Sequence, residues 1–567
     1  MPKGGFGSLI ALPLQRNPRD HGNTLFLDEA FEPYADQWAF LSTIRKVRSE
    51  DVDSLVREAS RTGGIVGVKM SGDINDDEDP WTLPPSKKVP EPPITGTLPK
   101  KIQIVSGNLL YIDKNKLPPA LINRLIRLAA FQNPEFYKAQ AMRLPTFNKP
   151  RVISCAEEFS KHIGLPRGCL EDVTSLLKAH KVGVKLVDER FSGTRLETSF
   201  QGSLSPQQQE AAETILKHDI GTLSATTAFG KTVIGAWLVA ERKVNTLILV
   251  HRRQLMDQWR ERLAVFLDLP KSSIGQIGGG KNKPSGLVDI AVIQSLYQKG
   301  EVKDIVADYG QVIIDECHHL PAFSFEKVLK EVKARFVLGL TATPIRKDGH
   351  HPIIMMQCGP IRWRTNTKEQ TEARPFAHVV IARTTNFRIA PDSGDVGIQD
   401  IYAALAADDR RNDLILKDIQ KALEEGRSPL VLTERTEHLE RLAEGLKKLT
   451  KNVIVLRGGA GVKARRAIAE QIASISGTES RVLIATGRYV GEGFDDARLD
   501  TLFLTMPISW RGTLQQYAGR LHRLYDGKLV VQIYDYVDAG LPVLFRMYEK
   551  RLKGYEAIGY SIQRKTN

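Results

Sequence analysis

Cysteine is scarce in this 567-residue chain, and long apolar runs are missing. The four cysteines, at positions 155, 169, 317 and 358, show no Cys-x-x-Cys spacing, which argues against a zinc knuckle and against a disulfide framework. No stretch reaches the roughly 18 uncharged apolar residues that a membrane-spanning helix requires, and the N-terminal apolar run is too short for a signal peptide. We therefore expect a cytoplasmic protein without a membrane partner.

Acidic residues are outnumbered by basic ones. The chain has 66 Asp and Glu residues and 80 Lys and Arg residues, which gives a formal net charge of +14. This balance favours a polyanionic partner such as nucleic acid, although many basic proteins bind nothing acidic. At about 150 residues per domain, the length predicts three to four domains.

A phosphate-binding loop is predicted at Leu223–Thr232, LSATTAFGKT, where a short apolar run breaks into small residues. Small residues let backbone N–H groups surround an anion, Lys231 can reach terminal phosphates, and the Thr232 hydroxyl can ligate Mg²⁺. The sequence GKTVIGAWLVAER then predicts a helix whose N-terminal end also attracts phosphate. The strict pattern has Gly where Ala225 stands, so the loop needs support from other motifs.

Short apolar runs recur after Gly221, separated by helical or loop segments, as buried parallel strands are. The first set comprises 244–250, 288–293, 311–315 and 335–340. A second set begins at residues 429, 453, 481, 500 and 529. The pattern predicts two doubly wound α/β domains in tandem, with the helical segment 385–428 bridging the two sets.

Asp315 and Glu316 directly follow one of these apolar runs. We expect them and Lys231 at the carboxyl ends of strands in one sheet, where ligands bind in such folds. Asp315 is then placed to hold Mg²⁺, and Glu316 to orient or deprotonate the attacking water. An Asp-Glu pair can also be a plain helix N-cap with an acid in the first turn. The Cys-His-His that follows favours the functional interpretation.

Further polar groups follow later strands. Thr341 and Thr343 in LTATP could report a γ-phosphate to the second domain, or could form an ordinary capped turn. Arg520 and Arg523 in QYAGRLHR are predicted on one helical face, as a phosphate clamp or as a solvated basic helix. The segment 485–495 is Gly-rich, so its backbone could approach a ligand closely.

Residues 102–200 alternate strand-like runs with helical ones, which predicts a small accessory α/β domain. Within it, the stretch 131–151 mixes four aromatic with four basic residues. Such a stretch suits a surface that stacks bases and holds phosphates, or equally a domain edge whose rings lie in the core. Residues 71–101 form a charged, Pro-rich linker, and residues 1–70 look like a strand-turn-helix fragment.

The ordered set SATTAFGKT, LILVHRRQLMDQW, VIQSL, DECHH, LTATP, IATGRYVGEGFD and QQYAGRLHR resembles the motifs of superfamily 2 helicases of the DEAD/DEAH type. The similarity is greatest to the branch of xeroderma-pigmentosum group B and restriction-subunit helicases. It covers residues 203 to about 540 and implies tandem RecA-like parallel-sheet domains at 201–384 and 385–567.

The resemblance also implies roles for the matching residues. Gln208 would contact the adenine of ATP. The rest of the nucleotide and the Mg²⁺ ion would be bound by Ala228, Gly230, Lys231, Thr232, Asp315, Gly493 and Asp495. Catalytic roles fall to Lys231, Glu316, Arg520 and Arg523, and coupling of the two domains falls to His318, Thr341 and Thr343. The nucleic-acid track would comprise Arg252, Arg253, Gln294, Ser295, Thr486 and Gly487, chiefly along phosphates. Ala228 stands where the family pattern has Gly, so the loop must form without that freedom.

The fragment at residues 1–70 resembles the tail of the archaeo-eukaryotic primase domain that precedes the helicase in TOTE conflict-system primase-helicases. The segments GSLIALPLQ and GNTLFLDEAFEPYADQWAFLS carry this resemblance. The catalytic acids of such a primase would lie upstream, so we expect no primer synthesis. A primase or nuclease partner, and a role in defence or DNA repair, are implied.

Taken together, these motifs predict an ATP-dependent DNA helicase or translocase that acts on single-stranded or duplex DNA. Two alternatives share the same catalytic residues. One is an ATP-gated DNA clamp or remodeller that separates no strands, and the other is an RNA helicase, because phosphate contacts say little about the sugar. DNA is favoured because the resembling branch acts mostly on DNA.

Overall fold

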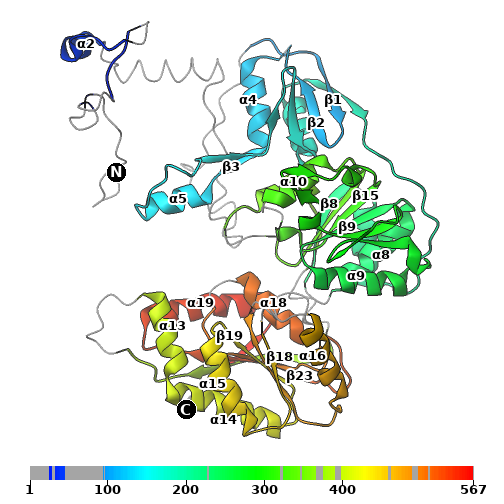
Figure 1. The fold of residues 1–567 in the computed structure, drawn as a ribbon, viewed down its shortest axis with the longest axis vertical. Helices are drawn as coiled ribbons and strands as arrows, with labels where there is room; N and C mark the ends of the chain where they lie inside the picture. The colour runs from blue at the N-terminus through cyan, green and yellow to red at the C-terminus, as the bar shows by residue number, and fades with distance from the viewer. Residues whose placement is uncertain are drawn as a thin grey trace. The chain divides into compact units, whose positions relative to one another are not determined.

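A computed structural model describes most of the chain (Figure 1). The described residues are 14, 19, 24–28, 32–44, 94, 96–115, 117–226, 229–319, 323–344, 348–365, 374–389, 397–457, 462–487, 496–508 and 511–565. The chain divides into a small unit (residues 1–66, 90–96 and 119–121) and a large unit that holds the rest. In the small unit, Leu27 pairs with Pro33 in an isolated antiparallel bridge, and the helix α2 (Gln37–Thr43) is capped by the Asp36 side chain. Across the described ranges, no helix is both long and apolar enough to span a membrane.

The accessory domain is built on a five-stranded sheet with the order β5-β6-β2-β1-β7. Along β1, buried residues alternate with exposed or half-exposed ones, so one face of the sheet lies in a core that α4 and α6 also enter. The predicted strands and helices of this region are confirmed. Its elements are β1 (Lys101–Ser106), β2 (Leu109–Asp113), α4 (Pro119–Leu128), β3 (Ala130–Gln132), α5 (Pro134–Ala141), β4 (Val152–Ser154), β5 (Glu157–Glu158), β6 (His162–Pro166), η3 (Arg167–Cys169), α6 (Leu170–Ala179) and β7 (Gly183–Asp188).

The first of two large sheets has eight strands in the order β11-β10-β12-β9-β15-β16-β8-β17. All neighbours are parallel except the edge pair β10 and β11. Its strands are β8 (Ile220–Ser224), β9 (Thr246–Val250), β10 (Ile274–Gly278), β11 (Lys281–Lys283), β12 (Val288–Val292), β15 (Gln311–Ile314), β16 (Phe336–Thr341) and β17 (Ile361–Arg364). Its helices are α7 (Pro206–Leu216), α8 (Lys231–Arg242), α9 (Arg253–Phe266), α10 (Phe323–Glu331) and α11 (Pro352–Cys358), with short 3-10 turns η4 (Lys271–Ser273), η5 (Ile293–Ser295), η6 (Asp304–Ala307) and η7 (Cys317–His319) and a small hairpin of β13 (Tyr297–Gln298) and β14 (Glu301–Val302).

Both faces of this sheet are buried, which explains why its strands are continuous apolar runs. Along β9, Ile248 and Val250 enter one hydrophobic cluster, whereas Leu247 and Leu249 enter the cluster on the opposite face. The four predicted strands of the first set are confirmed by β9, β12, β15 and β16.

The second large sheet has seven parallel strands in the order β20-β21-β19-β22-β23-β18-β24. Its strands are β18 (Ala377–Thr384), β19 (Pro429–Thr433), β20 (Val453–Leu456), β21 (Val482–Thr486), β22 (Thr501–Leu504), β23 (Val530–Val537) and β24 (Ser561–Lys565). Its helices are α13 (Ile398–Ala407), α14 (Asp409–Glu424), α15 (Thr436–Lys447), α16 (Val462–Ser474), α18 (Arg511–Leu521) and α19 (Pro542–Ala557). All five predicted strands of the second set are present.

The boundary predicted between residues 384 and 385 needs a correction. Strand β18 pairs along its whole length with β23, so it belongs to the second sheet. The border between the two sheets therefore falls between β17, which ends at Arg364, and β18, which begins at Ala377. The segment 385–428, predicted as a bridge, contributes α14 to the core of the second domain through Ile415, Ile419 and Ala422.

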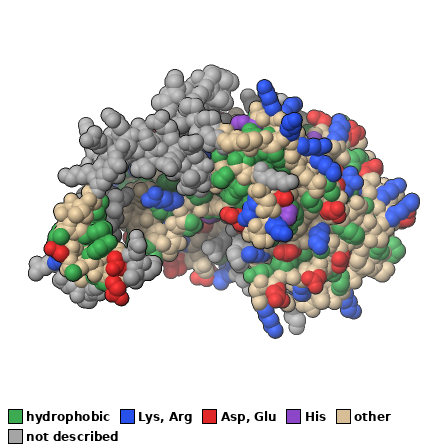
Figure 2. All heavy atoms as spheres, turned by 90° about the horizontal axis from the view of Figure 1, so that it is seen from above, with side chains coloured by type: hydrophobic (Ala, Val, Ile, Leu, Met, Phe, Trp, Pro, Cys, Tyr) green, Lys and Arg blue, Asp and Glu red, His purple; other side chains and the backbone are tan. Residues whose placement is uncertain are grey.

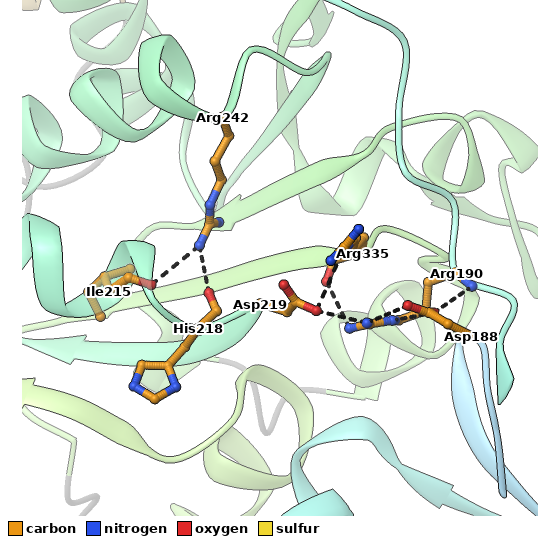
Figure 3. A network of polar contacts seen from close by, with 7 residues as sticks. All are labelled: Asp188, Arg190, Ile215, His218, Asp219, Arg242 and Arg335. Atoms are coloured by element: carbon orange, nitrogen blue, oxygen red, sulfur yellow. Dashed lines mark hydrogen bonds and ion pairs between the residues drawn. The ribbon is translucent and has the colours of Figure 1, made fainter. Parts of the chain in front are cut away.

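The accessory domain is fixed to the domain of the eight-stranded sheet by buried and charged contacts. Arg190 donates from Nη2 to Asp188 Oδ2 at 2.7 Å and to Asp219 Oδ2 at 2.8 Å, and Arg335 lies beside the same Asp219 (Figure 3). Arg167 is almost fully buried and donates to the carbonyls of Leu329 and Val332. Asp219 and Arg335 precede β8 and β16, so this attachment uses the amino ends of these strands. Their carboxyl ends remain available for ligands.

Candidate functional site

The phosphate loop follows β8, as predicted, and α8 begins at Lys231 directly after it. Gly230 is the residue before the helix and has φ +92°, a left-handed conformation that glycine adopts without a steric cost. The Lys231 ammonium donates to the carbonyls of Ala225 at 3.0 Å and Thr226 at 3.4 Å. The ammonium therefore lies over the loop that it is predicted to serve, with Thr232 next to it in the first turn. The predicted loop residue Ala228 lies outside the described residues.

Gln208 holds the phosphate loop from outside. Its side-chain Oε1 accepts from the Ser205 backbone N–H, and the Ser205 hydroxyl accepts from the Gln208 backbone N–H, which together form a capping box at the start of α7. Its Nε2 donates to the Phe229 carbonyl at 2.7 Å. Both ends of the Gln208 amide are thus engaged within the protein, so an adenine contact would require an exchange of partners.

Asp315 lies one residue past β15 and is 7% exposed. Trp259 of α9 donates from Nε1 to Asp315 Oδ2 at 2.8 Å, and the Glu316 backbone N–H donates to Oδ1 at 3.0 Å. Burial, and then the neighbouring Glu316 charge, raise the pKa of Asp315 to about 6. The sequence motifs included Trp259 without assigning it a role. The sequence feature that could have indicated the position of Trp259 is Gly235 in α8. A Cβ atom at Gly235 would lie 2.7 Å from the Trp259 indole ring, so only glycine leaves room for it.

Glu316 adopts a left-handed backbone conformation, with φ +48°. This conformation is unusual for a residue other than glycine and is typical of functional sites. Burial alone would raise the pKa of Glu316, but the Lys231 ammonium, and then His318 and His319, hold it below its usual range. Because Asp315 and Glu316 shift in opposite directions, the acidic pair holds one negative charge firmly and a second one weakly.

The predicted coupling residues are brought together around Thr341. Its hydroxyl lies 3.1 Å from His318 Nδ1 and accepts from the Thr343 backbone N–H at 3.0 Å. Its carbonyl accepts from the Ala225 N–H at the start of the phosphate loop. His318 Nδ1 also lies 3.2 Å from Glu316 Oε2. Phosphate loop, acidic pair and LTATP segment therefore form one connected cluster at the carboxyl ends of β8, β15 and β16.

The predicted nucleic-acid residues of the first domain occupy the other half of the same sheet edge. Arg252 and Arg253 follow β9, and Gln294 and Ser295 follow β12. Gln294 Nε2 donates to the His251 carbonyl at 3.3 Å. The His251 ring lies 4.1 Å from the His319 ring, measured between centroids. These histidines connect the phosphate half of the edge to the half that carries the exposed arginines.

A glycine turn that the sequence analysis missed completes this half of the edge. Residues 278–280, at the turn from the end of β10 to β11, are all glycine and all have positive φ angles. A Cβ atom on Gly278 would lie 2.4 Å from Ser295 Oγ, and one on Gly279 would lie 3.1 Å from Arg253 Cδ. The backbone of these three glycines thus packs closely against the side chains of Ser295 and Arg253, two residues predicted to contact nucleic acid. The run GGG in the sequence is the signal that could have located it.

In the second domain, Gly487 follows β21 and packs against α18. A Cβ atom on Gly487 would lie 2.2 Å from Tyr517 Oη and 2.7 Å from Glu434 Oε1. Thr486 is the last residue of β21, so both predicted track residues lie at a strand end beside the helix that carries Arg520. The predicted nucleotide contacts Gly493 and Asp495 lie outside the described residues.

The prediction that Arg520 and Arg523 share a helical face is wrong, because α18 ends at Leu521. The Lys528 side chain binds the backbone at the end of α18. Its ammonium lies 3.1 Å from the Leu521 carbonyl and 2.8 Å from the Arg523 carbonyl. The same ammonium donates to the carbonyls of Ala497 and Leu499. Burial lowers the pKa of Lys528 to about 8. Lys528 thus joins the end of the arginine helix to residues 497–499.

Trp259→Phe should destabilise the site, because Asp315 Oδ2 loses its indole donor while it stays buried. A buried acceptor left without a donor costs about 1–3 kcal/mol. We expect the free energy of unfolding of the first domain to fall by that amount in urea titrations, together with a lower ATPase rate. Trp237→Phe in α8 is the matched control, since Trp237 packs at the edge of the same core. Equal effects of the two substitutions would show that the hydrogen bond is unimportant.

Comparison with known proteins agrees with this geometry. The family described as the res subunit of type III restriction enzymes matches residues 201–346, which include the phosphate loop and the acidic pair. Helicase 161L of Invertebrate iridescent virus 6 is 28% identical over 381 residues, covering 64% of this chain and 83% of that protein. These matches and the motif order fit a superfamily 2 helicase. This helicase is therefore an ATP-hydrolysing enzyme.

Two further relatives place the helicase in the branch predicted from its motifs. The DNA 3'-5' translocase XPB2 of Sulfurisphaera tokodaii is 34% identical over 166 residues, which cover 29% of this chain and 36% of that protein. The DNA 3'-5' helicase XPB of Kineococcus radiotolerans is 28% identical over 279 residues, covering 47% of each. The helicase thus spans half or less of these two relatives. Residues 1–55 match the archaeo-eukaryotic primase domain of TOTE conflict systems, as the sequence predicted.

Proposed function

We propose that this helicase hydrolyses ATP with Mg²⁺ and moves along DNA in the 3′ to 5′ direction. The observation that carries the proposal is the shared sheet edge. Lys231 follows β8, Asp315 and Glu316 follow β15, and the exposed arginines lie on the neighbouring half. The 3'-5' names of the two XPB relatives support the direction.

Within the phosphate half, the chemistry of each side chain suggests a division of labour. Lys231 and the N–H groups around Gly230 would hold the terminal phosphates. Glu316, ionised at neutral pH because its pKa is low, would orient and deprotonate the attacking water. Gln208 would keep the loop in place, and its amide could reach the adenine after an exchange of partners.

The residues present fit a Mg²⁺ ion. Asp315 and Thr232 supply hard oxygen ligands, and Mg²⁺ in nucleotide sites is held by one or two protein oxygens together with substrate phosphates and water. The weakly held second charge of the acidic pair suits a position beside a cation. When bound, the ion would neutralise charge that develops on the phosphates.

Coupling between the halves would run through histidine and threonine side chains. His318 contacts both Glu316 and Thr341, so loss of the γ-phosphate could be transmitted to Thr341 and Thr343. The pair His251 and His319 would carry the change to the polymer side. From the second domain, Arg520 and Arg523 would contribute an arginine finger, worth roughly 10³–10⁵ in rate where it has been measured, and Gly493 and Asp495 would contact the nucleotide.

The polymer would lie along Arg252, Arg253, Gln294 and Ser295, and along Thr486 and Gly487 of the second domain. Arginine, amide and hydroxyl side chains and exposed backbone N–H groups suit phosphate contacts that do not depend on sequence. We propose DNA as the polymer, and a primase as a partner or covalent neighbour, because residues 1–55 match a primase domain. A role in defence follows from the same match.

Strand displacement should depend on which overhang the DNA carries. On a duplex with a 3′ single-stranded tail, we expect ATP-dependent release of the labelled partner strand, and little release from a 5′-tailed duplex of the same sequence. The measurement is gel separation of released strand over time, with Lys231→Ala as the inactive control. Efficient release only from the 5′-tailed duplex would refute the direction.

The same assay distinguishes the alternatives. ATP turnover stimulated by DNA, with no strand released from either duplex, would identify a clamp or remodeller. Turnover stimulated by RNA but not by DNA would identify an RNA helicase. Turnover that is independent of any polymer would contradict the proposed coupling.

A further inference from the structure

The accessory domain carries a projecting segment, residues 130–151, that we name the basic arm. It consists of β3, α5 and the loop that returns to β4, and Figure 1 shows α5 and β3 extending away from α4 and the sheet of β1 and β2. Asn133 closes its base: the backbone N–H donates to the Arg151 carbonyl, and Nδ2 donates to the Pro150 carbonyl at 2.8 Å. The arm is thus a closed loop with ordered ends.

The far part of the arm exposes large apolar side chains. Phe147 is 92% exposed, Met142 59% and Leu144 52%, and the Tyr137 ring is 38% exposed. At the base, by contrast, Phe131 and Phe136 are buried. The buried base rings agree with a domain edge whose rings lie in the core, whereas the outer rings face solvent, as a base-stacking surface would require.

The arm is also basic. Between residues 130 and 151 there are four Lys and Arg, at 138, 143, 149 and 151, and a single acid, Glu135. Elsewhere charges of both signs are mixed: on the face drawn in Figure 2, Lys and Arg are interspersed with Asp and Glu over the described surface. An exposed aromatic ring within a local excess of positive charge complements an unpaired base with its phosphates.

The base of the arm contacts the first helicase domain. The Phe131 ring meets the His350 ring edge-on, with centroids 6.2 Å apart, and His350 lies between the LTATP segment and α11. In addition, a Cβ atom on Gly168 would lie 2.0 Å from the Met355 carbonyl of α11. The accessory domain and the first helicase domain are therefore packed backbone against backbone, and the arm is held in a fixed position relative to the ATP-binding domain.

We propose that the basic arm binds single-stranded DNA, with Phe147 stacking on an unpaired base and the flanking Lys and Arg contacting its phosphates. The inference rests on the proposed DNA-translocase function and adds a second contact, outside the two helicase sheets. Held by the first domain, the arm grips the strand that the motor pulls or displaces. Duplex DNA, whose bases are already stacked, offers Phe147 no partner.

The test is the affinity of the full chain for a labelled single strand and for a blunt duplex, measured by fluorescence anisotropy. Phe147→Ala should weaken single-strand binding roughly 5- to 150-fold, the range of one base–aromatic stack, and should leave duplex binding within twofold. Phe147→Leu keeps an apolar side chain without the ring and should lose nearly as much. Phe545→Ala, which removes another exposed ring, is the control and should bind like the wild type.

Charge is tested separately through salt dependence. Lys138→Gln combined with Arg143→Gln should reduce the slope of log affinity against log salt by about 1.4 for a single strand, because each phosphate contact contributes about 0.7. These side chains lie outside the ATP site, so ATP turnover without DNA should be unchanged in all variants.

The outcomes separate this inference from the proposed function. If DNA stimulates ATP turnover in the wild type but Phe147→Ala binds single strands normally, the arm proposal is overturned and the translocase proposal stands. If DNA neither binds nor stimulates turnover in the wild type, both are overturned. Equal weakening of duplex and single-strand binding would also overturn stacking as the mode of contact.

Discussion

Glu316→Gln should lower the rate of ATP hydrolysis by roughly 10²- to 10⁴-fold, the usual contribution of a positioned general base, while ATP still binds. The amide keeps the size of the side chain but cannot accept a proton. Lys231 and the phosphate loop are untouched by the substitution, so the affinity for nucleotide should stay within a few-fold of the wild type. The measurements are steady-state phosphate release and equilibrium binding of a fluorescent ATP analogue.

Glu326→Gln provides the matched control. Glu326 lies in α10 of the same domain and forms an ion pair with Lys330 at 3.2 Å, away from the phosphate loop. It should retain turnover. Hydrolysis by Glu316→Gln at more than a third of the wild-type rate would show that another group activates the water, and loss of nucleotide binding would show that Glu316 mainly supports the loop.

Acidification from pH 7.5 to 5.5 should lower the free energy of unfolding of the second helicase domain by a few kcal/mol. Three buried histidines there resist protonation. Burial, and then nearby arginines, lower the pKa of His438 to about 3, and burial with Arg374 lowers that of His378 to about 4. Burial, then Arg374, His378 and Lys528, lower the pKa of His522 well below its ordinary value.

Stability falls on acidification because the unfolded chain takes up protons that the folded domain does not. In the unfolded chain a histidine binds a proton near pH 6.5, whereas these three stay neutral in the folded domain. Stability is therefore constant above about pH 7.5 and falls as the pH drops below 6.5, by about 1 kcal/mol per histidine at pH 5.5. Geometry explains the resistance of His438: its Nδ1 lies 2.9 Å from the Thr433 hydroxyl and its Nε2 lies 2.9 Å from Asn412 Oδ1. With Nε2–H donating to the amide oxygen, Nδ1 of the neutral ring accepts from the Thr433 hydroxyl, and that hydroxyl would have to reorient if Nδ1 gained a proton.

Hydrogen exchange of β19, β22 and β23 at the two pH values measures this loss for the second domain alone. His438→Gln can make the same two hydrogen bonds without titrating, so it should remove about a third of the pH effect. His162→Gln, at an exposed position of β6, should remove none. A pH effect of the same size in His438→Gln and in the wild type would contradict the explanation.

Sequence reasoning located the elements that bury apolar side chains on both faces, because continuous runs such as 246–250 have few other structural solutions. It also placed Asp315 and Glu316 correctly, since the carboxyl ends of parallel strands meet at one edge of a sheet. Residue roles at this edge stay predictions, as do those of Ala228, Gly493 and Asp495.

What the sequence could not supply depends on contacts between distant segments. The end of α18 before Arg523 is set by Lys528, whose four carbonyl partners lie in two separate segments. Strand β18 was missed as part of the second sheet because its partner β23 lies about 150 residues later. The role of Trp259 needed the fold, which brings its indole to Asp315. Helical periodicity and apolar pattern are local signals and carry none of this information.

The strand order of the first sheet separates two sets of loops that can change independently during evolution. Loops after β9 and β12 carry the residues predicted to face the polymer, and loops after β8, β15 and β16 carry those predicted to face ATP. Substitutions in the first set can therefore retune the choice of polymer while hydrolysis is preserved. The ring contact of His251 and His319 joins the two sets of loops. A substitution at either histidine is therefore expected to alter the coupling of ATP hydrolysis to movement along the polymer before it alters hydrolysis or polymer binding alone.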